Sequence, residues 1–136
     1  MPSDRQHLVD AYWKNYALTH GSREERVQAD EWFWAWIEVE DSVRAASPDV
    51  FDLVLALVVS APNDDALNYI GAGPLEDLIN WHGAAFVDRI EESARKNRAF
   101  RHALFGVRLS EEVPPAVRER LAVFIAPFPG TAPFPG

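Results

Sequence analysis

The chain of 136 residues contains no cysteine. It can therefore form neither a disulfide framework nor a thiolate metal site, and it has no thiol nucleophile. Long apolar runs are absent too, because the longest one, residues 53–59, falls far short of the roughly 18 residues that a membrane-spanning helix needs. The opening residues, MPSDRQHLVDAYW, lack the basic and apolar segments of a secretory signal. We therefore expect a cytoplasmic protein with no membrane association.

Basic residues are scarce in the first half of the chain. Residues 1–68 hold five Lys and Arg against thirteen Asp and Glu, whereas residues 69–136 hold eight of each, so the formal net charge of −8 arises in the first half. A negative field repels nucleic-acid phosphates and attracts cationic surfaces. The pattern argues against a nucleic-acid partner and is compatible with a basic protein partner, although acidity also simply keeps proteins soluble.

The sequence does contain the composition of a globular protein, with 48% hydrophobic and 25% charged residues, and repeated helix-start signals. Ser3 with Gln6, and Ser22 with Glu25, have the spacing of capping boxes, and Asn63 is a further cap. We predict an all-α fold: a single compact domain over residues 1–125 with six to eight short helices, packed as antiparallel αα-hairpins or stacked like a helical repeat. Residues 126–136, with APFPG twice, are predicted to form a Pro/Gly-rich flexible tail.

Residues 23–46 are predicted to form one helix with an apolar stripe at helical spacing: Trp32, Trp36, Val39, Val43 and Ala46. If this stripe faces the core, Trp34 lies on the opposite side, among acidic residues. An exposed Trp in that setting can anchor a protein partner, and the candidate binding residues are Trp34, Glu38, Glu40 and Asp41. The alternative, which we favour, is that Trp34 packs under the N-terminal helix against Tyr12, Trp13 or Tyr16.

Residues 47–59, SPDVFDLVLALVV, are ambiguous because an unbroken aliphatic run also suits a buried strand. Ser47 as a cap, Pro48 at the first helical position and Asp49 near the positive end favour a helix. The predicted core combines this segment with the apolar stripes of the others: Trp36, Val43, Leu53, Leu57, Leu78, Ile79, Ile90, Leu104 and Leu121.

The segment YIGAGPLEDLINWHG, residues 69–83, has glycines that suggest a phosphate-binding loop. Glu76 stands where a third glycine belongs, no lysine follows, and Pro74 lacks an N–H donor, so we expect no nucleotide or other cofactor. The glycines are predicted to be structural. A helix stops at Gly71, Gly71 or Gly73 adopts positive φ, Pro74 opens the next helix, and Gly83 ends it.

Catalytic signatures are weak. The four histidines, His7, His20, His82 and His102, have no ligand spacing, so no metal site is predicted, and no serine lies in a nucleophile elbow. Asp77 and His82 are five residues apart, about 140° around a helix, and cannot pair locally. A small enzyme with a site built from Glu76, Asp77 and His82 is the alternative function, and it requires tertiary convergence.

One part of the chain has a motif-like order. It contains Gly-x-Gly-Pro-Leu-Glu-Asp-Leu at residues 71–78, the pair His82 and Gly83, an amphipathic segment at 86–94 and Phe-Arg-x-x-Leu at 100–104. In these features residues 52–107 resemble an uncharacterised family of small bacterial proteins, a domain of unknown function. The resemblance implies a helical fold and no particular activity. We expect a small acidic protein-interaction module, of immunity or accessory type, with an unidentified protein partner.

Overall fold

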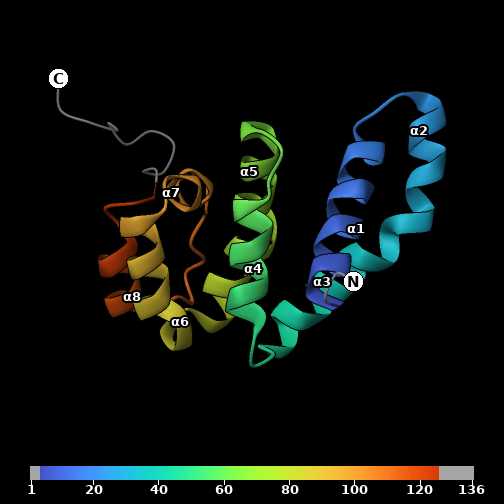
Figure 1. Cartoon of the computed structure of the whole chain (residues 1–136). Helices are drawn as coiled ribbons and strands as arrows, with labels where there is room; N and C mark the ends of the chain where they lie inside the picture. Colours follow the sequence, from blue (N-terminus) through green and yellow to red (C-terminus); the bar gives the residue numbers. More distant parts are fainter. Residues whose placement is uncertain (1–3, 126–136) are drawn as a thin grey trace, which may run out of the picture. The chain divides into compact units, whose positions relative to one another are not determined.

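The computed structural model describes residues 4–125, and helices are the only regular structure in that range (Figure 1). The predicted all-α fold is confirmed, with α-helices α1 to α8. The predicted tail at 126–136 and the cap at Ser3 lie outside the described residues. The chain divides between Pro62 and Asn63 into two compact units, called here the N-terminal unit and the C-terminal unit. Each is described by itself.

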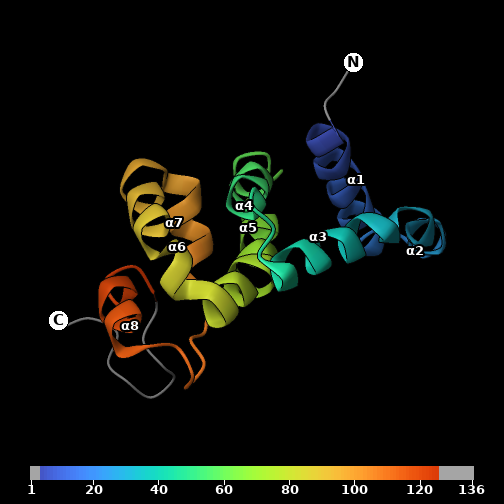
Figure 2. The same ribbon diagram turned by 90° about the horizontal axis from the view of Figure 1, so that it is seen from below.

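The N-terminal unit is organised around its first helix. It contains α1 (Asp4–Thr19), α2 (Arg23–Gln28), the 3₁₀ turn η1 (Ala29–Trp32), α3 (Phe33–Ala45) and α4 (Val50–Val59). α1 and α2 lie side by side as an antiparallel pair, and α1 also contacts η1, α3 and α4 (Figures 1 and 2). α1 is buried on more than one side, with Val9, Tyr12 and Tyr16 on one face and Leu18 on the opposite one, so α1 is the common packing partner of the unit.

Residues 23–46 do not form the single helix that we predicted. The capping box of Ser22 and Glu25 is present, but the helix ends at Gln28 and η1 separates it from α3. The buried Asn15 amide donates to the Ala29 carbonyl oxygen at 3.0 Å and fixes the start of η1. A 3₁₀ turn advances about 120° per residue instead of 100°, so it shifts the phase of the apolar stripe. Trp32 is therefore only half-buried.

The inner face of α3 consists of Ala35, Val39 and Val43. At its end Ala46 adopts the left-handed conformation, with φ 51° and ψ 51°, and its N–H is bonded to the last turn. The next segment is the predicted helix and not a strand, although α4 begins at Val50, two residues after Pro48. α4 is buried along most of its length, including Leu57 with an exposed fraction of 0%.

The C-terminal unit contains α5 (Asp64–Ile70), the π-helical turn η2 (Gly71–Leu75), α6 (Glu76–Lys96), α7 (Arg98–Phe105) and α8 (Pro115–Leu121). α7 packs against α5, η2 and α6, and α8 packs against α6. Figure 2 shows α6 and α7 side by side. The side chains of Asn63 and Asn97 accept hydrogen bonds from the backbone N–H groups of Ala66 and Phe100, so local capping starts α5 and α7.

The predicted role of the first two glycines is wrong. Gly71 has helical angles, φ −61° and ψ −41°, so the helix does not stop at this residue. The change of direction comes at Gly73, with φ −120° and ψ −107°, so neither residue has positive φ. A Cβ at Gly71 would collide with the backbone carbonyl of Ala103, whose carbon would lie 3.0 Å away. Gly71 therefore serves the close approach of α7 and not a turn.

The helix break predicted at Gly83 lies one residue earlier: α6 joins two helical segments across a kink at His82, where φ is −139° and ψ is 22°. Gly83 is the first residue after the kink. The non-helical residue of η2 is Gly73, so Pro74 directly follows the break, as predicted, and α6 begins at Glu76. A Cβ at Gly83 would lie 3.2 Å from Cγ1 of Val117 in α8, so this glycine also allows two helices to approach closely.

The predicted core is confirmed with one exception. The eight aliphatic residues from Val43 to Leu121 are all buried, whereas Trp36 is only half-buried and stacks on Phe33 with ring centroids 5.3 Å apart. Trp36 lies at the edge of the inner face of α3, because that face is centred on Val39. None of the helices in residues 4–125 has both the length and the apolar character needed to cross a bilayer.

Candidate functional site

The outer face of α3 carries large apolar side chains next to carboxylates. Phe33, Ile37 and Asp41 follow one another at every fourth residue, and Trp34 and Glu38 form the adjacent row. The exposed fractions are 44% for Phe33, 39% for Trp34 and 43% for Ile37. We call these five residues the outer face of α3.

Trp34 packs against His7, near the start of α1. Its ring stacks on His7, with centroids 5.5 Å apart and planes at 28°. Tyr12, Trp13 and Tyr16, the neighbours that we favoured from the sequence, pack edge-to-face with one another, with centroids 5.3 Å apart in both pairs. Trp34 thus contacts the N-terminal helix, but it keeps more than a third of its surface exposed.

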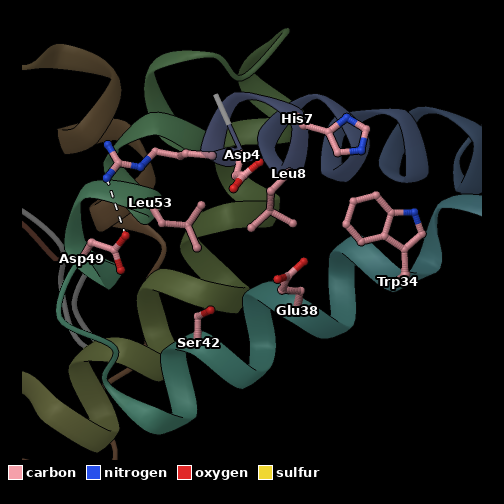
Figure 3. Close-up of a pocket in the computed structure, with 9 residues that line it drawn as sticks. Asp4, His7, Leu8, Trp34, Glu38, Ser42, Asp49 and Leu53 are labelled. Carbon is pink, nitrogen blue, oxygen red and sulfur yellow. Dashed lines mark ion pairs between the residues drawn. The ribbon is translucent and has the colours of Figure 1, made fainter. Parts of the chain in front are cut away.

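A groove of about 420 Å³ runs between α1, α3 and α4 (Figure 3). Leu8 and Leu53 project into it from opposite sides, and the stacked rings of His7 and Trp34 form one end. Its side walls include the hydroxyl of Ser42. The groove therefore combines an apolar lining with an aromatic end.

The charges around the groove are mostly negative. Asp4, Glu38 and Asp49 contribute carboxylates, whereas Arg5 contributes the only guanidinium among its lining residues. Arg5 pairs with Asp49 at 3.7 Å at the end away from Trp34. Within residues 4–125, neither Asp4 nor Glu38 has a hydrogen-bond or ion-pair partner for its carboxylate. Asp4 and Glu38 thus bring two carboxylates to the groove that have no ion-pair partner among the described residues.

The predicted binding residues fall into two groups. Trp34 and Glu38 line the groove and also belong to the outer face of α3. Asp41 belongs to the outer face alone, and Glu40 pairs with Arg44 of the same helix at 3.4 Å. Sequence reasoning did not identify His7 as part of the site, because its contact with Trp34 depends on how α1 packs against α3.

Glu76, one of the three residues of the alternative enzyme site, is hydrogen-bonded to the connection between α7 and α8. Its Oε1 accepts a hydrogen bond from the backbone N–H of Arg108 at 2.7 Å. Asn80, one turn further along α6, donates to the Arg108 carbonyl at 3.0 Å and accepts from the Ser110 N–H at 2.9 Å. These three bonds fix the start of the connection between α7 and α8. Asp77 is half-buried in the first turn of α6, and His82 is half-buried at the kink.

Arg120 joins α8 to α6 in the C-terminal unit. Its guanidinium donates to Asp88 at 2.7 Å and to both oxygens of Glu91, at 3.0 and 3.1 Å. The hydrogen bonds from Arg120 hold the pKa of the Glu91 carboxyl below its usual value, and those to Glu91 and Asp88 raise the pKa of Arg120. The charges of Arg120, Asp88 and Glu91 are therefore paired with one another inside the C-terminal unit.

Among residues 4–125, no group of three or more His, Asp and Glu side chains is arranged to hold a metal ion. The model of a family of unknown function, DUF6869, matches residues 22–126. The chain belongs to DUF6869. The match takes in α2 to α8, so the outer face of α3 lies inside the DUF6869 region and His7 lies before it. No curated protein and no solved structure matches the chain.

Proposed function

We propose that this DUF6869 protein is a small interaction module, of accessory or immunity type, that binds a basic partner protein through the outer face of α3. The observation that carries the proposal is the exposure of Phe33, Trp34 and Ile37 on consecutive turns of one helix, beside Glu38 and Asp41. A monomeric protein gains nothing in stability from large apolar groups placed in water, and contiguous apolar patches of this kind commonly mark interaction sites.

The two chemical components of the face suit two stages of association. The surplus of carboxylates attracts a cationic surface over a long range and raises the rate of encounter. Trp34 then supplies a large apolar group that can be desolvated against the partner, as tryptophan does at energetically dominant contacts. The stacking of Trp34 on His7 limits the freedom of the indole before binding, so less entropy is lost on association.

The engagement of Glu76 supports an interaction module over the alternative small enzyme. A catalytic carboxylate must reach a substrate, whereas Oε1 of Glu76 already accepts the Arg108 N–H. We further propose that residues 71–78 and the pair His82 and Gly83 form the signature of the family, and that the host is bacterial. Gly71 and Gly83 both stand where another helix approaches closely, which supports a shared packing requirement.

The test uses the full chain, immobilised and exposed to a bacterial extract, followed by titration calorimetry with the purified partner. Trp34→Ala and Asp41→Lys should each weaken binding by about tenfold or more, the loss expected for an important interface residue. Trp81→Ala and Glu119→Lys are matched controls, because they make the same kinds of change at exposed positions of the C-terminal unit and should leave the affinity unchanged.

A partner with a basic surface, and an affinity that falls as salt is raised, would support the proposed steering. Unchanged binding in both Trp34→Ala and Asp41→Lys would eliminate the outer face of α3 as the binding surface. Equal losses in the variants and their controls would show that the measurement reports general charge or folding, and would also count against the proposal.

A further inference from the structure

We infer that the groove between α1, α3 and α4 receives one basic side chain, lysine or arginine, from the partner protein. The inference rests on the proposed function and specifies its chemistry. The outer face of α3 would provide the apolar contact, and the groove would provide the site that selects a cation. Trp34 and Glu38 belong to both surfaces and make them continuous.

The groove has the composition that a long basic side chain requires. Lysine and arginine carry an aliphatic stem and a charged head, and they bind best where the stem meets apolar surface while the head meets carboxylates. Leu8 and Leu53 supply the apolar surface (Figure 3). The carboxylate of Glu38 reaches into the groove from α3, and that of Asp4 faces it from α1.

Charge complementarity favours a cation over a neutral or acidic occupant. Glu38 and Asp4 lack a partner within residues 4–125, so an incoming head group gains two carboxylates without breaking an existing pair. At the other end of the groove, the guanidinium of Arg5 already forms an ion pair with Asp49. The flat indole of Trp34 adds a surface on which a cation is attracted to the ring.

Small side-chain mimics test this inference without the partner. The full chain, labelled with ¹⁵N and with ¹³C at its methyl groups, is titrated with n-butylguanidinium and n-butylammonium, which reproduce the ends of arginine and lysine. Both should cause saturable shifts at the Trp34 indole and the methyl groups of Leu8 and Leu53, with the millimolar affinity usual for so few atoms. n-Butanol, the neutral analogue, should bind at least several-fold more weakly.

Glu38→Gln should weaken binding of both cations by about fivefold or more, since it removes the charge and keeps the shape. Asp41→Asn is the matched control on the same helix, because Asp41 is exposed and does not line the groove. The absence of saturable shifts, equal binding of n-butanol, or an equal effect of Asp41→Asn would each overturn the inference. If Glu38→Gln abolishes binding of the two cations but leaves the affinity for the partner protein unchanged, the groove has no role in partner recognition. The proposal for the outer face of α3 would not be affected by that result.

A different set of results would show that the proposed function is wrong. If the mimics bind as expected but Trp34→Ala and Asp41→Lys leave partner affinity unchanged, the groove binds cations and the outer face of α3 is not the interface. The two sets of variants therefore separate the two proposals.

Discussion

The two units use charge in different ways. The N-terminal unit, residues 1–62, has eleven Asp and Glu against five Lys and Arg, whereas the C-terminal unit has ten against eight. In the C-terminal unit, Arg120 connects α8 to Asp88 and Glu91 of α6, so charge holds helices together. In the N-terminal unit, Asp and Glu outnumber Lys and Arg by six. This excess of negative charge supports the basic partner that we propose for the unit.

The apolar side chains differ in a similar way. Both units bury a continuous set of aliphatic residues, so neither one lacks a core. The N-terminal unit in addition exposes Phe33, Trp34 and Ile37 on consecutive turns of one helix. Under the proposed function, the outward face of a single helix adds a binding surface to a well-packed unit.

The first prediction tests whether the N-terminal unit combines its open surface with a tight core. Leu57→Ala should lower the free energy of unfolding by about 2–5 kcal/mol, because Leu57 is fully buried in α4 and its loss leaves a cavity. Val59→Ala, two residues further along the same helix, should change it by less than about 0.5 kcal/mol, because Val59 is 61% exposed. Urea denaturation followed by circular dichroism measures both, and equal effects would show that this core is loosely packed.

The second prediction concerns the close helix packing of the C-terminal unit. Gly71→Ala should cost about 1–3 kcal/mol, because the new methyl group meets the rigid backbone of Ala103. Gly106→Ala is the control: its nearest neighbour would be the Ala103 carbonyl oxygen at 3.9 Å, an ordinary contact, and its backbone angles are helical. The same denaturation measurement applies. A Gly71→Ala variant as stable as Gly106→Ala would contradict the assignment of Gly71 to helix approach.

The third and smallest effect is on the charge network of the C-terminal unit. Because the pKa of Glu91 is lowered in the folded protein, its contribution to stability is present above about pH 4.5 and is lost as the pH falls through the lower, folded-state value. Arg120→Gln should move the Glu91 pKa back toward its ordinary value and reduce this dependence. Arg98→Gln, at an exposed position of α7, should leave it unchanged. Carboxyl ¹³C shifts followed by NMR through an acid titration report the pKa directly.

Local signals in the sequence predicted the helices well. Caps at Ser22 and Asn63 act within a few residues, so their effect can be read without knowing the fold. The glycine roles were not predictable in the same way. Gly71 is required by Ala103, which lies in another helix, and only the packed structure brings the two together.

The candidate site was predictable in part. The sequence pointed to Trp34, Glu38 and Asp41 because helical periodicity places them away from the apolar stripe. It did not point to His7, Leu8 or Asp49, since a groove between three helices depends on tertiary packing. The stripe itself was displaced because no sequence signal marked the 3₁₀ turn before α3.

That turn imposes a constraint on length. The four residues of η1 rotate α3 by about 80° more than an uninterrupted α-helix would, and the hydrogen bond from Asn15 to Ala29 fixes where the rotation begins. One inserted or deleted residue between Ala29 and Phe33 would turn Trp34 and Glu38 by roughly 120°, away from their present place at the groove. Members of DUF6869 that use this face should therefore tolerate substitutions in η1 but not insertions or deletions.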